Sequence, residues 1–127
     1  MTTPITGLMQ AGVHVNDIRR ARDFYGKTLG LRETHYMDNI KEAYFEIPGS
    51  PVPLAVHQYN VGCDKMGGRP PGTVSGMVFT VSNVEQAVDD LKKKGVTITD
   101  MPFKGPTGGM LATIADPDGN EYLLTTR

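Results

Sequence analysis

The chain has one cysteine, no tryptophan and almost no net charge. Cys63 has no partner among the 127 residues, so we expect no internal disulfide, as is usual in a reducing cytoplasm. Lysine and arginine total 13 against 14 acidic residues, and no basic run follows one face. The charge pattern of nucleic-acid binding is therefore missing, and a small-molecule ligand fits better.

Long apolar runs are also absent. None approaches the roughly 18 residues that a membrane helix needs, and the first ten residues lack the tripartite pattern of a secretory signal. We expect a cytoplasmic protein without a membrane partner. A chain of 127 residues buries roughly two-thirds of its unfolded surface without help from a metal, so any bound metal would be functional.

An internal repeat organises the sequence. The segments 15–18 (Val-Asn-Asp-Ile) and 81–84 (Val-Ser-Asn-Val) are similar, begin 66 residues apart, and both introduce a helical pattern. Gly30 and Gly95 end the two helices, and the separation between these glycines is one residue shorter than the 66-residue shift. The halves predict a single domain of module 5–61 and module 73–127, joined by the glycine- and proline-rich linker 62–72.

Each half predicts one amphipathic helix. In the second half, apolar residues recur at helical spacing over 84–91, Ser82 and Glu85 match a capping box, and Gly95 ends the pattern. The first helix is similar: Asn16 or Asp17 caps it and Gly30 ends it. Its apolar stripe consists of Ile18, Ala21, Phe24, Tyr25 and Leu29.

Short alternating segments around each helix predict four strands per half. They cover 9–15, 33–37, 42–47 and 54–59 in the first half and 75–81, 97–101, 110–115 and 121–125 in the second. The order in each half is strand, helix and three strands, which predicts an α+β fold of two βαβββ modules. The glycine-rich run 103–109 is typical either of a lid over a pocket or of a hairpin connection.

Three motifs carry a resemblance to a known family. They are Val15-Asn16-Asp17 followed by Arg22-Asp23-Phe24-Tyr25 and Leu29-Gly30-Leu31, the second copy of that pattern, and Asp116-Pro117-Asp118-Gly119-Asn120. With them the chain resembles the vicinal oxygen chelate superfamily of glyoxalase I, bleomycin-resistance and extradiol-dioxygenase proteins. The resemblance covers nearly the whole chain. It implies curved mixed sheets around a cleft and a homodimer, but it does not define the chemistry, because isomerases, dioxygenases and drug binders share the fold.

Four positions of that family usually supply His, Gln or Glu to a divalent metal. Carried over to this chain, they fall on Gln10, Ala55, Gly76 and Leu123. Only Gln10 has a side chain that can ligate, whereas a catalytic ion ordinarily takes about three protein ligands. We therefore expect no family metal site and no metal cofactor. A shifted register in the fourth strand would place Val56 or His57 at the ligand position, and only His57 would restore part of the site.

Strand alternation predicts which side chains face the cleft. Residues two apart share a face, and Ala11, Val13 and Val15 are expected to pack under the helix. The ligand-contacting residues expected on this basis are Gln10, His57, Tyr59, Thr80 and Leu123. His14 and Glu121 are the candidate catalytic pair, because imidazole titrates near neutral pH and a carboxylate can accept a proton.

Two functions remain open at this point. The first is metal-independent binding of a small aromatic or amphipathic compound, as in drug-resistance proteins. The second is a lyase or isomerase resembling glyoxalase I, which would use His14 and Glu121 or a displaced divalent ion held by these two residues and His57. The missing ligands at Gly76 and Leu123 favour the binding protein.

Overall fold

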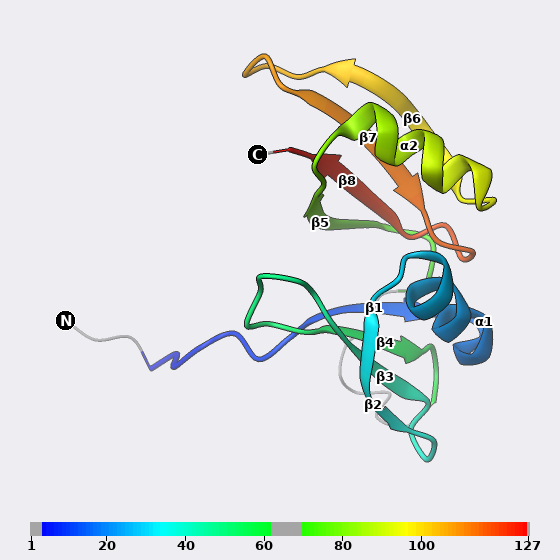
Figure 1. Ribbon diagram of the computed structural model, residues 1–127. Coiled ribbons are helices and arrows are strands. Elements are labelled where there is room, and N and C mark those ends of the chain that lie inside the picture. The colour runs from blue at the N-terminus through cyan, green and yellow to red at the C-terminus, as the bar shows by residue number, and fades with distance from the viewer. Residues whose placement is uncertain (1–3, 62–69, 127) are drawn as a thin grey trace.

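Strands and helices follow one another in the predicted order in the computed structural model, which describes residues 4–61 and 70–126 (Figure 1). The first module comprises β1 (Ala11–Val15), α1 (Ile18–Arg22), η1 (Asp23–Thr28), β2 (Arg32–Met37), β3 (Glu42–Glu46) and β4 (Leu54–Gln58). The second comprises β5 (Val74–Thr80), α2 (Val84–Lys93), β6 (Thr97–Lys104), β7 (Met110–Ala115) and β8 (Glu121–Thr125). The predicted α+β fold of two βαβββ modules is confirmed. Most of the predicted linker, including Cys63, lies outside the described residues.

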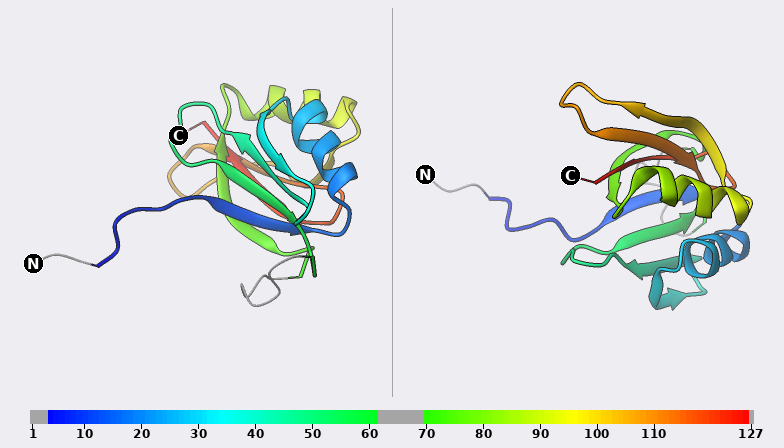
Figure 2. Two further views of the ribbon diagram at one scale, coloured as in Figure 1. Left: turned by 90° about the horizontal axis from the view of Figure 1, so that it is seen from below. Right: turned by 45° about the horizontal axis from the view of Figure 1, so that its top comes forward.

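Each module forms one four-stranded mixed sheet. The strand order is β1-β4-β3-β2 in the first sheet and β5-β8-β7-β6 in the second. The pairs β1–β4 and β5–β8 are parallel, and the other pairs are antiparallel. Helices α1 and α2 lie on the same side of the molecule (Figure 2). Lys94 Nζ donates to the carbonyl oxygen of Thr28 at 3.4 Å and so links the ends of the two helical segments.

The helix ends follow the sequence signals with one correction. Asp17 caps α1 by accepting from the backbone N–H groups of Arg19 and Arg20. In α2 the predicted capping box at Ser82 and Glu85 is wrong, because Asn83 is the N-cap and accepts from the N–H of Gln86. The α2 helix thus starts one residue later, on a side chain that caps equally well.

The one-residue offset between the two glycines has a structural cause. Gly30 and Gly95 both have positive φ, 78° and 87°, and follow their helices as expected for glycine at this position. The first helix continues after Arg22 as the π-helical segment η1, whose wider turn holds one more residue than an α-helical turn. Phe24 and Tyr25 are consecutive there and both point into the core, with 7% and 0% exposure. We infer that η1 accommodates the extra residue of the first module.

The hydrophobic core runs through both modules. The alternation predicted for β1 is present, since Val13 and Val15 are buried while Gly12 is exposed and His14 is partly exposed. The two modules meet where the Tyr25 ring packs edge-on against Tyr122, which itself stacks on Phe79. Among the described residues, no helix is long and apolar enough to cross a membrane. The run 103–109 begins at the end of β6 and continues as the β6–β7 hairpin turn, in which the N–H of Gly105 donates to the carbonyl oxygen of Gly109.

Candidate functional site

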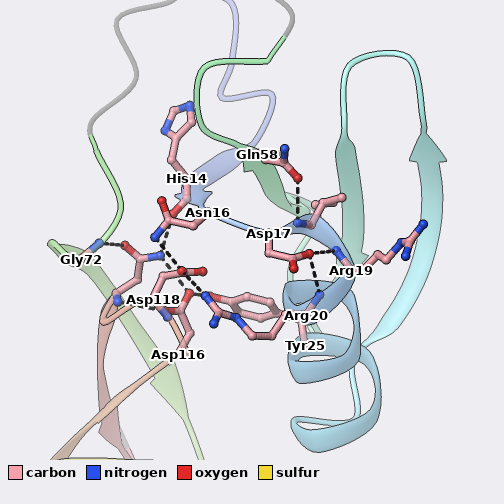
Figure 3. Close-up of polar contacts among 12 residues, drawn as sticks. His14, Asn16, Asp17, Arg19, Arg20, Tyr25, Gln58, Gly72, Asp116 and Asp118 are labelled. Atoms are coloured by element: carbon pink, nitrogen blue, oxygen red, sulfur yellow. Dashed lines mark hydrogen bonds and ion pairs between the residues drawn. The ribbon is translucent and has the colours of Figure 1, made fainter.

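A buried polar network joins the two modules below the end of β1 (Figure 3). The Tyr25 hydroxyl donates to Asp116 Oδ2 at 2.7 Å and lies 2.6 Å from the Tyr122 hydroxyl. Asn120 is 1% exposed, and its Nδ2 donates both to Asp116 Oδ2 and to the backbone carbonyl of His14. The network therefore ties the turn before β8 to the end of β1 and fixes the backbone of His14.

The edge of this network carries charge. Asp118 Oδ1 accepts from Asn16 Nδ2 at 2.9 Å and pairs with the Arg20 guanidinium. The Asp118 side chain is 1% exposed, whereas that of Arg20 is 51% exposed. In Figure 3 the His14 imidazole points away from Asp116 and Asp118. The carboxylates thus belong to the contact between the modules, and the imidazole faces a different surface.

That surface is the face of the first sheet opposite α1, which we call the helix-free face. Neighbours in a sheet point the same way, and the β1–β4 register pairs Gly12 with Ala55 and His14 with His57. The β3–β4 register adds Tyr44 beside Ala55 and Glu42 beside His57. The helix-free face therefore presents a row of small residues next to a row of two imidazoles and a carboxylate.

The two imidazoles are in mutual contact. The ring centroids of His14 and His57 lie 5.3 Å apart, and the Tyr59 ring meets His14 edge-on at 5.9 Å. Burial lowers the pKa of His14, His57 lowers it further, and Glu42 acts in the opposite direction. His14 is therefore neutral at pH 7, when its nitrogens can donate and accept hydrogen bonds.

Two polar atoms in this region are buried without a hydrogen-bond partner among the described residues. They are Gln10 Oε1 and His57 Nε2. A buried polar group that remains unpaired costs about 1–3 kcal/mol. Between them lie Gly12 and Ala55, and a methyl group placed on Gly12 would contact only the carbonyl oxygen of Ala55, at 3.7 Å. Gly12 is exposed, whereas Ala55 is 2% exposed, so only the Gly12 end of this row is open to solvent.

The other predicted site residues lie on the second sheet. Leu123 pairs with Val78, and Thr80 pairs with Thr125, so these side chains share the corresponding face of β5 and β8. Glu121 begins β8, and no hydrogen bond or ion pair between its side chain and His14 occurs in the described parts of the chain. The charged neighbours that shift the pKa of His14 are on its own sheet. The fold thus gathers His14, His57 and Tyr59 and places Thr80, Leu123 and Glu121 on the other module.

A cleft of about 770 Å³ opens between the modules on the helix side of the sheets. Leu8, Ile47, Met77, Phe79 and Leu91 are among its mostly apolar lining, and Thr80 is the one predicted ligand contact in it. Sequence alternation did not predict this cleft, because it lies between modules whose relative placement is not encoded in any local pattern. Glu42 was not among the predicted site residues. Its pairing with the fourth strand, beside His57, was the signal that could have placed it at the site.

The residues present do not fit the metal site that the resemblance implies. Glycine at position 76 has no side chain, and alanine at 55 and leucine at 123 have no donor atom. Gln10 supplies one neutral amide oxygen, which is a weaker ligand than imidazole or carboxylate. Within residues 4–61 and 70–126, no three His, Cys, Asp or Glu side chains are grouped so that they could hold a metal ion.

Two βαβββ modules with mixed sheets are the fold of the glyoxalases and bleomycin-resistance proteins. The chain belongs to the Glyoxalase/Bleomycin resistance protein/Dioxygenase superfamily, whose family model matches residues 7–123. It is 32% identical over 125 residues to a lactoylglutathione lyase of Escherichia coli O157:H7. The match covers 92% of this chain and 90% of the lyase.

Solved structures of the same superfamily superpose closely. A superfamily member from Sphaerobacter thermophilus has a TM-score of 0.78 and 28% identity, with 95% of this chain and 97% of that chain covered. TnmS3, an antibiotic binding protein from Streptomyces sp. CB03234, has a TM-score of 0.78 and 25% identity, with 98% of each chain covered. The relatives therefore include both an enzyme and a binding protein.

Proposed function

We propose that this chain is a small-molecule-binding protein of its superfamily that works without the family metal site. The observation that carries the proposal is the set of residues at the four family metal positions, of which only Gln10 can ligate. The antibiotic-binding neighbour supports the same assignment. The helix-free face, with its small residues, imidazoles and tyrosines, is suited to an aromatic or amphipathic ligand, because pocket aromatics commonly stack on flat ligands.

A thermal-shift screen on chelator-treated protein tests this function. A ligand at 100 times its Kd stabilises the folded state by about 2.7 kcal/mol, which raises Tm measurably in a domain of this size. We expect at least one small aromatic or amphipathic compound to raise Tm equally with and without added Ni²⁺ or Zn²⁺. If the compounds in the library raise Tm only after metal is added, metal-independent binding is refuted.

We also propose that the protein is a homodimer. In Figures 1 and 2 the N-terminal segment extends away from the rest of the chain in every view. Leu8 and Met9 on this segment are 72% and 75% exposed, and the apolar cleft beside Leu8 is open. Burying such apolar surface against a second copy would be favourable, since a fully buried Leu or Met side chain contributes about 1.5–3 kcal/mol.

The substitution Leu8→Asp is expected to weaken the dimer about tenfold or more, because a carboxylate would replace a buried leucine at the contact. Light scattering after gel filtration at micromolar concentration measures the change. Thr6→Asp, also on the exposed segment, is the matched control and should weaken the dimer less, because it removes no large apolar side chain. A monodisperse wild-type monomer under these conditions would contradict the proposal.

A lyase is the second candidate, and the 32% identity to lactoylglutathione lyase is the observation in its favour. Catalysis would then rest on His14 and Glu121 as acid and base, or on a divalent ion displaced from the family position. A spectrophotometric assay of lactoylglutathione turnover, with and without Ni²⁺ and Zn²⁺, separates the candidates. We expect no turnover above the buffer rate; turnover that is lost in His14→Ala would favour the enzyme.

A further inference from the structure

The cleft between the modules runs along the edge of β5. Five consecutive residues at the end of this strand, 77–81, line the cleft. Consecutive side chains of a strand point to opposite faces, so a cleft lined by all five follows the edge of the strand and not one of its faces. Among the described residues β5 pairs with β8 alone, so the edge that faces the cleft has no strand beside it. The cleft is therefore suited to an added strand.

The sequence of β5 does little to block such an addition. Edge strands of natural proteins are commonly protected by lysine, by proline or by a bulge. β5 has neither lysine nor proline, and Val74 and Val78 are 67% and 51% exposed. A register shift between these valines, with a φ of 77° at Gly76, leaves residues 77–80 as the regular part of the edge. This part is the one that lines the cleft.

We propose that the N-terminal segment 4–9 of a second copy of the chain fills this cleft and adds a strand to the β5 edge. The proposal rests on the homodimer proposed above and identifies the surface through which it forms. The segment has no charged side chain, and Leu8 and Met9 are 72% and 75% exposed. Of the described residues that line the cleft, Asp90 alone is charged. Docking the segment there buries apolar side chains and leaves no charge of its own without water.

The segment of the same chain is poorly placed to fill its own cleft. Leu8 contributes to the lining, but the described residues before it lead away from both modules in Figures 1 and 2. An extended chain advances about 3.3 Å per residue, so residues 4–7 reach roughly 13 Å beyond Leu8. That reach brings them to another molecule. Two-fold symmetry would let each copy give its segment to the other, which closes the assembly at a dimer.

Disulfide cross-linking tests this contact directly. Two variants, both with Cys63→Ser to remove the native thiol, combine Val78→Cys with either Leu8→Cys or Met9→Cys. Paired strands hold their Cα atoms within the roughly 4.4–6.8 Å that a disulfide spans. Mild oxidation should therefore give a dimer on a non-reducing gel, with the linked peptides identified by mass spectrometry. Consecutive side chains of a strand alternate, so one of the two variants should cross-link at least about tenfold more than the other.

Matched variants make the test specific. Lys27→Cys with Val78→Cys should give no dimer-sized band, because the Lys27 side chain is 84% exposed and lies on η1. Val78→Lys should weaken the dimer about tenfold in light scattering, because an edge lysine opposes strand addition. Met101→Lys, at a 53% exposed position on β6, should leave the dimer unchanged. Both lysines replace exposed side chains, so an unchanged Tm shows that the fold is intact.

The outcomes separate the surface from the dimer and from ligand binding. A disulfide within one chain, or equal yields from the two arm positions, would overturn strand addition by a second copy. A dimer that forms neither disulfide would overturn the surface and leave the homodimer standing, whereas a wild-type monomer would overturn both. If Val78→Lys leaves the dimer intact but removes the Tm shift of a compound from the ligand screen, the cleft holds a small molecule instead. None of these results decides metal-independent binding, which the screen tests by itself.

Discussion

Replacing Asp116 by alanine is expected to lower the free energy of unfolding by about 3–5 kcal/mol. Its Oδ2 accepts from the Tyr25 hydroxyl and from Asn120 Nδ2, and its Oδ1 accepts from the backbone N–H groups of Asp118 and Asn120. Asp116 is 3% exposed, so water cannot replace the lost acceptor. Four donors would be left without this partner at the contact between the modules.

Urea denaturation followed by circular dichroism measures the effect, together with a Tm decrease of roughly 10 °C or more. Asp89→Ala on the exposed face of α2 is the matched control and should stay within about 0.5 kcal/mol of the wild type. A loss of less than about 1 kcal/mol in Asp116→Ala would show that apolar packing alone holds the modules together.

Alkaline solution is expected to destabilise the protein steeply through Tyr25 and Tyr122. Burial is the main cause that raises the pKa of both hydroxyls above the ordinary value of 10.0. Above pH 10 the unfolded tyrosines lose their protons while the folded ones keep theirs. The free energy of unfolding therefore falls by up to about 1.4 kcal/mol per pH unit for each tyrosine, and this stabilisation is fully present below pH 10.

Urea denaturation of the wild type and of Tyr122→Phe at several values between pH 9 and pH 12 checks this slope. Removing one of the two buried hydroxyls should make the fall with pH less steep by up to about 1.4 kcal/mol per pH unit. Tyr59→Phe, outside the contact between the modules, is the control and should match the wild-type slope. Equal slopes in the wild type and in Tyr122→Phe would mean that the hydroxyls are not shielded from water.

The fold was predictable because its signals are local. Alternation and turn residues placed β7 at 110–115 and β8 at 121–125, as observed. β6 extends to Lys104, beyond its predicted end at 101, because Phe103 and Lys104 pair with Leu111 and Met110 in the hairpin. That extension depends on a partner strand and cannot be read from the segment itself.

The candidate site was predictable only in part. Alternation along β1 placed Gln10 and His14 on one face, but the contact of His14 with His57 depends on the register of two parallel strands more than 35 residues apart. Asp116 and Asn120 were recognised only as part of a family motif, because their role arises where one module meets the other. Local periodicity contains no information about either arrangement.

The proposed function requires a binding face without a metal, and the residues that favour it are Ala55, Gly76 and Leu123. The relatives span a lyase and an antibiotic-binding protein, so superfamily membership alone does not decide between them. The ligand chemistry of the helix-free face is what distinguishes the two.

The decisive measurement is the metal content of the purified protein. It is measured by elemental mass spectrometry on protein purified without a tag or chelator, before and after incubation with Ni²⁺, Zn²⁺, Mn²⁺ and Fe²⁺. We predict less than about a tenth of an equivalent of any metal, because one neutral amide cannot retain a divalent ion through purification. Near-stoichiometric metal that is lost in His57→Ala would contradict metal-free binding and favour the enzyme.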